Sequence, residues 1–397
     1  MTRRAVIVDI VRSPFGKGRE GGALTGLHPV DLYAHMLSTL VKRTGIEPEL
    51  IEDVITGCVL QVGEQAGNIG RQAVLAAGLP ESIPAVTLDR KCGSAQQAVD
   101  FAAQGIIAGA YDVVVAGGVE MMSLVPMRAT RLGRDWEGPQ FRRRYPEGLV
   151  RQGISAELIA AKWGLTREAQ DEFAYHSHKK AAAALDAHLF DDAIIPLAVP
   201  DEAGRHFVRQ DEGVRRDTSL EKLASLRTAF QDDAMAARFP QIHWSVTAGN
   251  SSQVTDGAGA ALIMEERIAH RLGLRPRAAI THFAVTGDDP MLMLTGVIPA
   301  TKKLLARARL KIDDVDAFEV NEAFASVVLA WLRDTRADPA RVNMYGGAIA
   351  FGHPVGASGM RLLLQLITAL EQEKKRYGLQ TMCESGGMAN ATLIERL

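Results

Sequence analysis

The chain has 397 residues, a formal net charge of −2, 47% hydrophobic residues and 23% charged residues. This composition is that of a folded protein, and the nearly balanced charge gives no basis for nucleic acid as a partner. The length predicts two or three compact units. The three cysteines, Cys58, Cys92 and Cys383, are too few and too widely spaced for a disulfide framework or a CxxC site, so we expect no metal and a reducing compartment.

The first predicted element is a strand over Ala5–Ile10. Its apolar run is short and contains Asp9, which is typical of a buried strand and not of a signal peptide. The longest other apolar runs, 113–119 and 324–332, are far below the ~18 residues of a membrane span. The chain ends in Glu395-Arg396-Leu397, which is not a peroxisomal address. We therefore expect a cytoplasmic protein without a membrane partner.

A strand–turn–helix–strand unit is predicted over 83–118. A strand over Ile83–Leu88 leads to a turn that contains Cys92, and apolar residues from Ala95 to Ile106 then follow helical spacing. Gly109 is expected to end the helix. An apolar strand over Asp112–Ala116 follows, and we expect Gly117 and Gly118 to close it.

A similar unit is predicted near the C-terminus. A Gly-rich turn over 352–359 precedes a helix that includes 360–367, and a strand over 379–382 ends at Cys383. The Gly-Gly pairs at 117 and 386 are separated by 269 residues, and two Asp-Val pairs at 53 and 314 are separated by 261. Two halves with the same order of elements predict an α/β protein built by internal duplication.

Between the halves lies a polar stretch, roughly 123–241, with predicted helices over 151–163 and 166–188. Its segment 128–151 contains seven arginines against three acidic residues. Such a segment is either a solvated excursion or a basic surface beside a phosphate-bearing ligand. The chain re-enters the first half at 245–256, before an apolar strand over 258–264. We therefore expect units at 1–122, 123–244, 245–270 and 271–397, the second being a loop domain over an active site.

Cys92 lies between a strand and the first turn of a helix. Free backbone N–H groups and the helix dipole would stabilise a thiolate there, which is one way to make a nucleophilic cysteine. A small buried cysteine at a helix start explains the position equally well. His353, on a rigid Gly/Pro turn, suits a general base, or it is a histidine satisfied by local turn hydrogen bonds.

Two further residues follow predicted strands. Cys383 precedes a Gly-Gly turn, and Asn321 follows the strand 315–320. The Asn321 amide could hold a water or a carbonyl group, or it could be a helix N-cap. Cys58 is expected to be a core residue. We expect Cys92, His353, Asn321 and Cys383 at the carboxyl ends of strands, where α/β folds place their sites.

Five motifs together make the chain similar to the thiolase family over essentially its whole length. They are Lys91-Cys92-Gly93-Ser94; 246–252 with Asp256-Gly257-Ala258; Asn321-Glu322-Ala323-Phe324; 346–350 leading into Gly352-His353-Pro354-Val355-Gly356; and Cys383 with Gly386-Gly387. This family comprises acetyl-CoA acetyltransferases and 3-ketoacyl-CoA thiolases. The Cys92 motif and the segment 377–383 most resemble thiolases of actinobacterial steroid degradation.

The resemblance implies a five-layer αβαβα fold with an inserted loop domain, and dimers or tetramers. It implies that Cys92 is the acylated nucleophile, His353 its base, and Cys383 the second acid/base. Asn321 would hold a water that, with His353, stabilises an enolate oxygen. A second oxyanion hole would use the backbone N–H groups of Cys92 and Ser385.

The same resemblance assigns Arg227, Ser252, Met293 and Phe324 to binding of substrate or CoA. Ser385 departs from the family, which has glycine there, and a left-handed backbone at this position would cost ~1 kcal/mol. Arg151-Gln152 replaces a His-Met pair beside the pantetheine, and Leu294 replaces a small residue next to the acyl pocket. Acyl or CoA contacts should therefore differ from those of short-chain enzymes.

The implied function is acyl transfer. A 3-ketoacyl-CoA would be cleaved by CoA to acetyl-CoA or propionyl-CoA and a shortened acyl-CoA, or formed in reverse, through an acyl-Cys92 intermediate with ping-pong kinetics. CoA is then a substrate, no cofactor is expected, and the pathway would be lipid or steroid β-oxidation. The alternative is a thiolase-like protein that binds CoA or lipid with little turnover.

Overall fold

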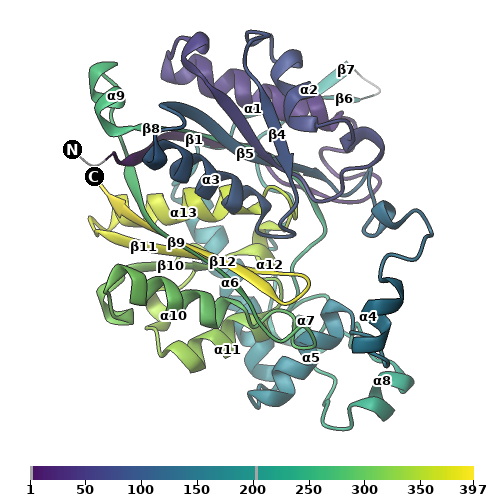
Figure 1. Ribbon diagram of the computed structural model, residues 1–397. Coiled ribbons are helices and arrows are strands. Elements are labelled where there is room, and N and C mark those ends of the chain that lie inside the picture. Colours follow the sequence, from purple (N-terminus) through teal and green to yellow (C-terminus); the bar gives the residue numbers. More distant parts are fainter. Residues whose placement is uncertain (1–2, 202–203) are drawn as a thin grey trace.

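The computed structural model describes residues 3–201 and 204–397 of a mixed α/β fold (Figure 1). The strands are β1 (Ala5–Arg12), β2 (Gly16–Lys17), β3 (Asp53–Gly57), β4 (Ala85–Leu88), β5 (Val113–Met121), β6 (Leu197–Asp201), β7 (Gly204–Val208), β8 (Thr255–Glu265), β9 (Ala278–Gly287), β10 (Ala317–Val320), β11 (Tyr377–Glu384) and β12 (Met388–Arg396). The helices are α1 (Pro29–Thr44), α2 (Ile69–Ala76), α3 (Ser94–Ala108), α4 (Gly138–Arg144), α5 (Gln152–Lys162), α6 (Arg167–Asp186), α7 (Leu220–Ala224), α8 (Asp233–Arg238), α9 (Glu266–Arg271), α10 (Val297–Ala308), α11 (Ala325–Thr335), α12 (Ala348–Phe351) and α13 (Ser358–Gln372).

The order of the strands confirms the predicted duplication. The N-terminal half runs β4-β3-β5-β8-β1, and the C-terminal half runs β10-β11-β12-β9. In the first half β3 is parallel to β5, and β8 is antiparallel to both β5 and β1. In the second half β10 is parallel to β11, and β12 is antiparallel to both β11 and β9. The counterpart of β4 is reduced to one parallel bridge between Phe318 and Val342.

The two half-sheets meet at a short antiparallel pairing of β1 with β9, and helices form the remaining layers. In Figure 1, α1 and α2 cover the outer face of the N-terminal half, α10 and α11 cover the C-terminal half, and α3 and α13 lie between the halves. This is the five-layer arrangement that the resemblance implies.

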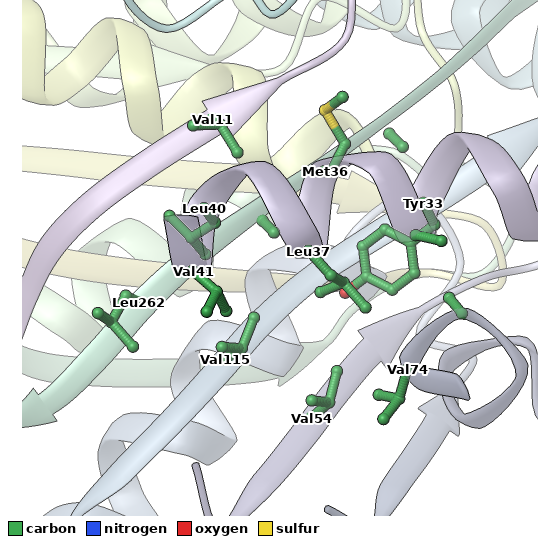
Figure 2. Packing of buried hydrophobic residues seen from close by; sticks show 14 of the residues in the cluster. Val11, Tyr33, Met36, Leu37, Leu40, Val41, Val54, Val74, Val115 and Leu262 are labelled. Atoms are coloured by element: carbon green, nitrogen blue, oxygen red, sulfur yellow. The ribbon is translucent and has the colours of Figure 1, made fainter. Parts of the chain in front are cut away.

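Alternating residues of the strands supply two separate cores. Val6 and Val11 of β1 belong to the outer core, in which Leu37 and Leu40 of α1 pack against Val115 of β5 (Figure 2). The opposite faces of the same strands join α3 and α13 in an inner core. Because side chains alternate across a strand, each sheet binds an outer and an inner helical layer, which fixes α3 and α13 at the centre.

One local expectation is wrong: Gly117 and Gly118 do not end a strand. Both lie inside β5, paired with Ala260 and Gly259 of β8. A β-carbon on either would collide with backbone of another segment, so these glycines permit close packing and do not form a turn. Gly386 and Gly387, by contrast, do form the turn between β11 and β12, with φ of 95° and 77°. The two glycine pairs are therefore not structural equivalents.

The inserted stretch contains α4 to α8 and the β6–β7 hairpin. The helices predicted over 151–163 and 166–188 are confirmed as α5 and α6, within two residues at each end. Within the described residues, the helices include none with the length and apolarity that crossing a membrane requires.

Candidate active site

The Cys92 turn connects β4 to α3. The Ser94 hydroxyl closes it, because it donates to the Lys91 carbonyl (2.6 Å) and accepts from the Arg90 N–H (2.9 Å). The helix begins at Ser94 with Gly93 as its N-cap, and Cys92 is buried just before it. The predicted position of Cys92 between a strand and a helix start is therefore confirmed.

His353 does not follow a strand, contrary to expectation. It lies between α12 and α13, because residues 348–351, which follow the Val342 bridge, form a short helix before the turn. Its backbone N–H donates to the Gln253 carbonyl (3.0 Å) and the Thr255 hydroxyl (2.9 Å). These bonds tie the turn to the segment that returns from the insertion.

The hydrogen bonds of Ser358 define the tautomer of His353. The Ser358 hydroxyl donates its one hydrogen to the Pro354 carbonyl (2.8 Å), so it must accept from His353 Nδ1, 2.5 Å away. The proton therefore lies on Nδ1. Nε2 is buried and has no hydrogen-bond partner among the described residues. Burial, helped by Arg361, lowers the pKa of His353 to about 3, which leaves a neutral imidazole with a free lone pair.

Cys383 lies one residue before the end of β11, and Asn321 directly follows β10. The Asn321 amide donates to Cys383 Sγ (3.9 Å), while its Oδ1 is buried without a partner in the described part of the chain. Asn321 is not a helix N-cap, since α11 begins at Ala325 with Phe324 in that role. The parallel pairing of β10 with β11 thus brings two predicted site residues into contact.

The starts of α3 and α13 cross closely, which brings the Cys92 and His353 turns together. A β-carbon at Gly359 of α13 would lie 2.5 Å from the Gln96 backbone nitrogen of α3. A β-carbon at Gly118 would collide with the Gly356 carbonyl and lie 3.0 Å from the Ala95 side chain. Residues of both turns also share a small core cluster, in which Cys92 packs with Val355 and Met382.

The resting state of Cys92 differs from the expected thiolate. Burial raises the pKa of the thiol, and nearby Cys383 and Glu384 raise it further. The backbone N–H groups of Cys92 and Ser385 donate to the sulfur and lower its pKa, but they do not offset burial. The pKa of Cys383 is likewise raised by burial, to about 12. Both sulfurs are therefore thiols at neutral pH, and Cys92 needs a base.

Ser385 occupies its position without backbone strain. It lies in the β11–β12 turn but is absent from the described non-glycine residues with positive φ, and Gly386 and Gly387 take the left-handed positions instead. Its backbone N–H lowers the pKa of the Cys92 thiol. The expected cost of a left-handed backbone at this serine therefore does not arise.

Three of the residues expected to bind substrate lie close together, near Cys383, and the fourth, Arg227, lies apart from them. Ser252 donates its N–H to the Ala323 carbonyl (2.9 Å), next to Phe324. Phe324 and Met293 share a core cluster with Cys383. Arg227 is exposed on the loop after α7, next to Thr228, which bridges to Thr247 of the returning segment.

Sequence reasoning did not assign roles to two residues here. Ser358, which fixes the His353 tautomer, was visible as a serine five residues after the histidine in the Gly-rich turn. Glu384, buried beside both sulfurs, was visible as an acidic residue directly after Cys383 in an apolar strand. Cys58 lies in the outer core, as expected. No group of three or more His, Cys, Asp or Glu side chains in residues 3–201 and 204–397 is arranged to hold a metal ion.

Comparison with known proteins agrees with this geometry. Residues 5–267 match the thiolase N-terminal domain and residues 274–396 match the thiolase C-terminal domain. The chain is 47% identical to the steroid 3-ketoacyl-CoA thiolase FadA6 of Mycobacterium tuberculosis, over 99% of this chain and 94% of that protein. It is 40% identical to the 3-ketoacyl-CoA thiolase FadA of Escherichia coli K12, over 99% of this chain and all of that protein.

A solved structure shows the same fold. The crystal structure of the Bacillus anthracis acetyl-CoA acetyltransferase superposes with a TM-score of 0.89 at 37% identity, covering 100% of this chain and 99% of that one. Both halves of the duplicated sheet and the turns that carry Cys92, His353 and Cys383 are thus parts of a known architecture. The chain belongs to the thiolase family.

Proposed function

We propose that the protein is an acyltransferase that cleaves a 3-ketoacyl-CoA with CoA, or runs the reverse condensation, through an acyl-Cys92 intermediate. Membership in the thiolase family and the names of its relatives support this reaction class. The observation that carries the assignment of Cys92 is its position: a buried sulfur directly before the start of α3, in a turn packed against that of His353.

In the first half-reaction, Cys92 gives its proton to His353 Nε2 and attacks the 3-keto carbon. The N–H groups of Cys92 and Ser385 stabilise the oxyanion that forms there, each donor contributing about 3–4 kcal/mol in comparable sites. The C2–C3 bond then breaks, and its electron pair forms the enolate of acetyl-CoA or propionyl-CoA. Protonated His353 and a water held by Asn321 stabilise the enolate oxygen, and Cys383 donates a proton to C2.

In the second half-reaction, the Cys383 thiolate takes the thiol proton of an incoming CoA. The CoA thiolate attacks the acyl-Cys92 carbonyl, Cys92 leaves as a thiolate, and His353 returns the proton to it. The enzyme is then restored, and the two products leave in separate steps. Two thiols are needed because one holds the acyl group while the other moves a proton.

Acyl transfer to Cys92 tests this proposal directly. Incubation with acetyl-CoA should add one acyl group to the intact protein and to the peptide that carries Cys92. Cys92→Ala should lose the adduct and lower thiolysis by about 10⁴-fold or more. Cys58→Ala, a matched change in the outer core, should keep the adduct. An unlabelled wild-type protein that binds acyl-CoA tightly would instead indicate a binding protein with little turnover.

The acyl group of the 3-ketoacyl-CoA determines which substrates the enzyme accepts. FadA6 is named for steroid substrates and FadA for 3-ketoacyl-CoAs in general, and both names suggest lipid β-oxidation. We propose Ser252, Phe324, Met293 and Arg227 as contacts of the acyl-CoA. A thiolysis panel of short-chain, long-chain and polycyclic 3-ketoacyl-CoAs, with Met293→Ala as the variant, should rank these classes through changes in KM.

We also propose a cytoplasmic homo-oligomer, a dimer or a tetramer, in which residues 123–244 form the loop domain over CoA. Strand β4 is an edge strand, and Val86 on it and Phe101 on the neighbouring α3 are 45% and 42% exposed. An edge with exposed apolar side chains favours pairing with a second chain. Light scattering during size exclusion tests the assembly, and Val86→Lys should weaken it. The three unpaired cysteines are consistent with a reducing compartment, which cell fractionation tests.

A further inference from the structure

A buried polar seam lies behind the Cys92 turn, where α3 of the first half faces β12 of the second. Asn390 Nδ2 donates to the Gly93 carbonyl (3.0 Å). Further along the seam, the Thr392 hydroxyl donates to Asp100 Oδ1 (2.6 Å) and accepts from Gln96 Nε2 (2.8 Å). These bonds bind the start of the helix that follows the nucleophile to the C-terminal half.

Glu384 closes this seam at the end nearest the sulfurs. Its side chain is fully buried, and a β-carbon at Gly93 would collide with its Oε1. The carboxyl group therefore lies directly against the backbone of the Cys92 turn, and a side chain at position 93 would displace it. Within the described residues, neither Oε1 nor Oε2 has a hydrogen-bond partner.

A second buried carboxyl group at the site shows how unusual this is. Glu120 accepts from the backbone N–H groups of Val59 (2.9 Å), Leu60 (3.2 Å) and Gly356 (2.9 Å) and from Gln65 (2.7 Å). Burial raises the pKa of Glu120 to about 7, because those donors offset only part of its effect, and the bond from Gly356 anchors the His353 turn. Glu384 lies against the other turn without donors, so its neutral form is favoured.

The charged and titratable groups around Glu384 come from three places: the Cys92 turn, α3 and β11. Burial raises its pKa to about 8, Arg90 opposes this shift, and Asp100 and Asp89 add to it. Cys92 and Cys383 are the remaining neighbours, and Glu384 in turn raises the pKa of both thiols. The Asn390 side chain, from β12, carries no charge. A carboxyl group that is neutral near pH 7 and charged above pH 8 thus lies beside two sulfurs that must ionise in turn.

We propose that Glu384 is a positioning residue that controls the reactivity of Cys92 through its own change of charge. This inference rests on the proposed function. While the carboxyl group is neutral, it supports the Gly93 turn and does not oppose a developing thiolate. Once the carboxyl group has lost its proton, its negative charge disfavours the Cys92 thiolate. The reactivity of Cys92 then rises less steeply with pH than it would if Glu384 carried no charge.

The test is the rate of iodoacetamide alkylation of Cys92 between pH 6 and 10, read by mass spectrometry of the peptide that carries it. In the wild type the rate should rise with pH and flatten near pH 8. In Glu384→Gln, which keeps the shape and removes the charge, the flattening should disappear. Alkylation should then be several-fold faster than in the wild type at pH 9 and within about two-fold at pH 6.5.

Two further variants keep Glu384 and remain informative if Glu384→Gln does not fold. Asp100→Asn removes a carboxyl group whose own pKa burial raises to about 8 and which opposes the charge on Glu384 once it has ionised, so the flattening should move to lower pH. Arg90→Gln removes an opposite charge and should move it to higher pH. A disturbance of packing would not shift the profile in opposite directions. Asp53→Asn, a half-buried carboxyl whose pKa is also raised, is the matched control and should leave the profile unchanged.

Identical profiles in the wild type and Glu384→Gln, or a ratio that is constant across pH, would overturn this inference. Neither outcome would affect the proposed function, which is judged by acyl labelling of Cys92 at neutral pH. Loss of that labelling in the wild type would overturn the proposed function while the alkylation profile still reported on Glu384.

Discussion

The starts of α3 and α13 are related by the duplication, but their surroundings differ. Both helices have fifteen residues, begin with serine and cross each other at the centre of the fold. The turn before α3 contains the exposed Asp89 and the half-buried Lys91, whereas residues 352–358 before α13 are all buried. In α3 the serine closes the turn on itself, and in α13 it holds the imidazole.

This difference shows how a duplicated fold supplies two unlike groups at one point. The C-terminal half holds His353 with Nε2 free, because its backbone N–H donates to Gln253 and Thr255 and its Nδ1 is bonded to Ser358. The N-terminal half presents a sulfur on a turn next to the surface. In the first half β4 leads directly to the turn, whereas in the second half α12 lies between the Val342 bridge and the turn.

Replacing His353, the proposed base, should have the largest effect of any change at the two turns that keeps Cys92. His353→Asn leaves Cys92 with a raised pKa and no acceptor for its proton, so kcat for thiolysis should fall by about 10³-fold, within the usual range for a general base. Steady-state kinetics and the rate of acyl labelling measure this. Ser358→Ala, which keeps the imidazole but frees its tautomer, should cost only about ten-fold. Labelling of His353→Asn at the wild-type rate would contradict the role of His353.

Separating the two helix starts should have the next largest effect. Gly118→Ala places a methyl group against the Gly356 carbonyl and the Ala95 side chain, so the free energy of unfolding should fall by about 2–3 kcal/mol. Urea denaturation measures it. Gly287→Ala is the control, because the nearest atom to its β-carbon is 3.9 Å away. Equal losses in both variants would show that the crossing does not depend on the glycine.

Because His353 is neutral in the folded protein, it makes the free energy of unfolding depend on pH. An imidazole in the unfolded chain gains a proton near pH 6.5, whereas His353 stays neutral until about pH 3. The unfolded state therefore binds more protons within this window, and His353 lowers wild-type stability as the pH falls below 6.5. Relative to the wild type, His353→Asn should gain about 2 kcal/mol between pH 7.5 and pH 5. Urea denaturation at both pH values measures this gain, and parallel pH curves would show that His353 gains its proton at the same pH in the folded and unfolded chain.

The sequence was sufficient for features that depend on near neighbours in the chain. Helical spacing and Gly109 predicted α3, and Gly386-Gly387 predicted the β11–β12 turn. The role of Gly117 and Gly118 was misread, because it depends on Gly259, Tyr33 and Gly356, which are distant in sequence. The thiol state of Cys92 could not be predicted either: the helix dipole is a local effect, whereas burial beside Cys383 and Glu384 exists only after the two halves pack.

The smallest expected effect concerns Ser385, where the family resemblance implies a glycine. Because Ser385 does not require a left-handed backbone and acts through its N–H, Ser385→Gly should change kcat by less than about two-fold. The free energy of unfolding should fall by about 0.5 kcal/mol, since glycine gains freedom in the unfolded chain. Gly386→Ala, at a φ of 95°, should lose about 1–2 kcal/mol in the same assay. A large gain in kcat for Ser385→Gly would instead mean that the serine side chain obstructs the oxyanion, and the two N–H groups alone would not describe the hole.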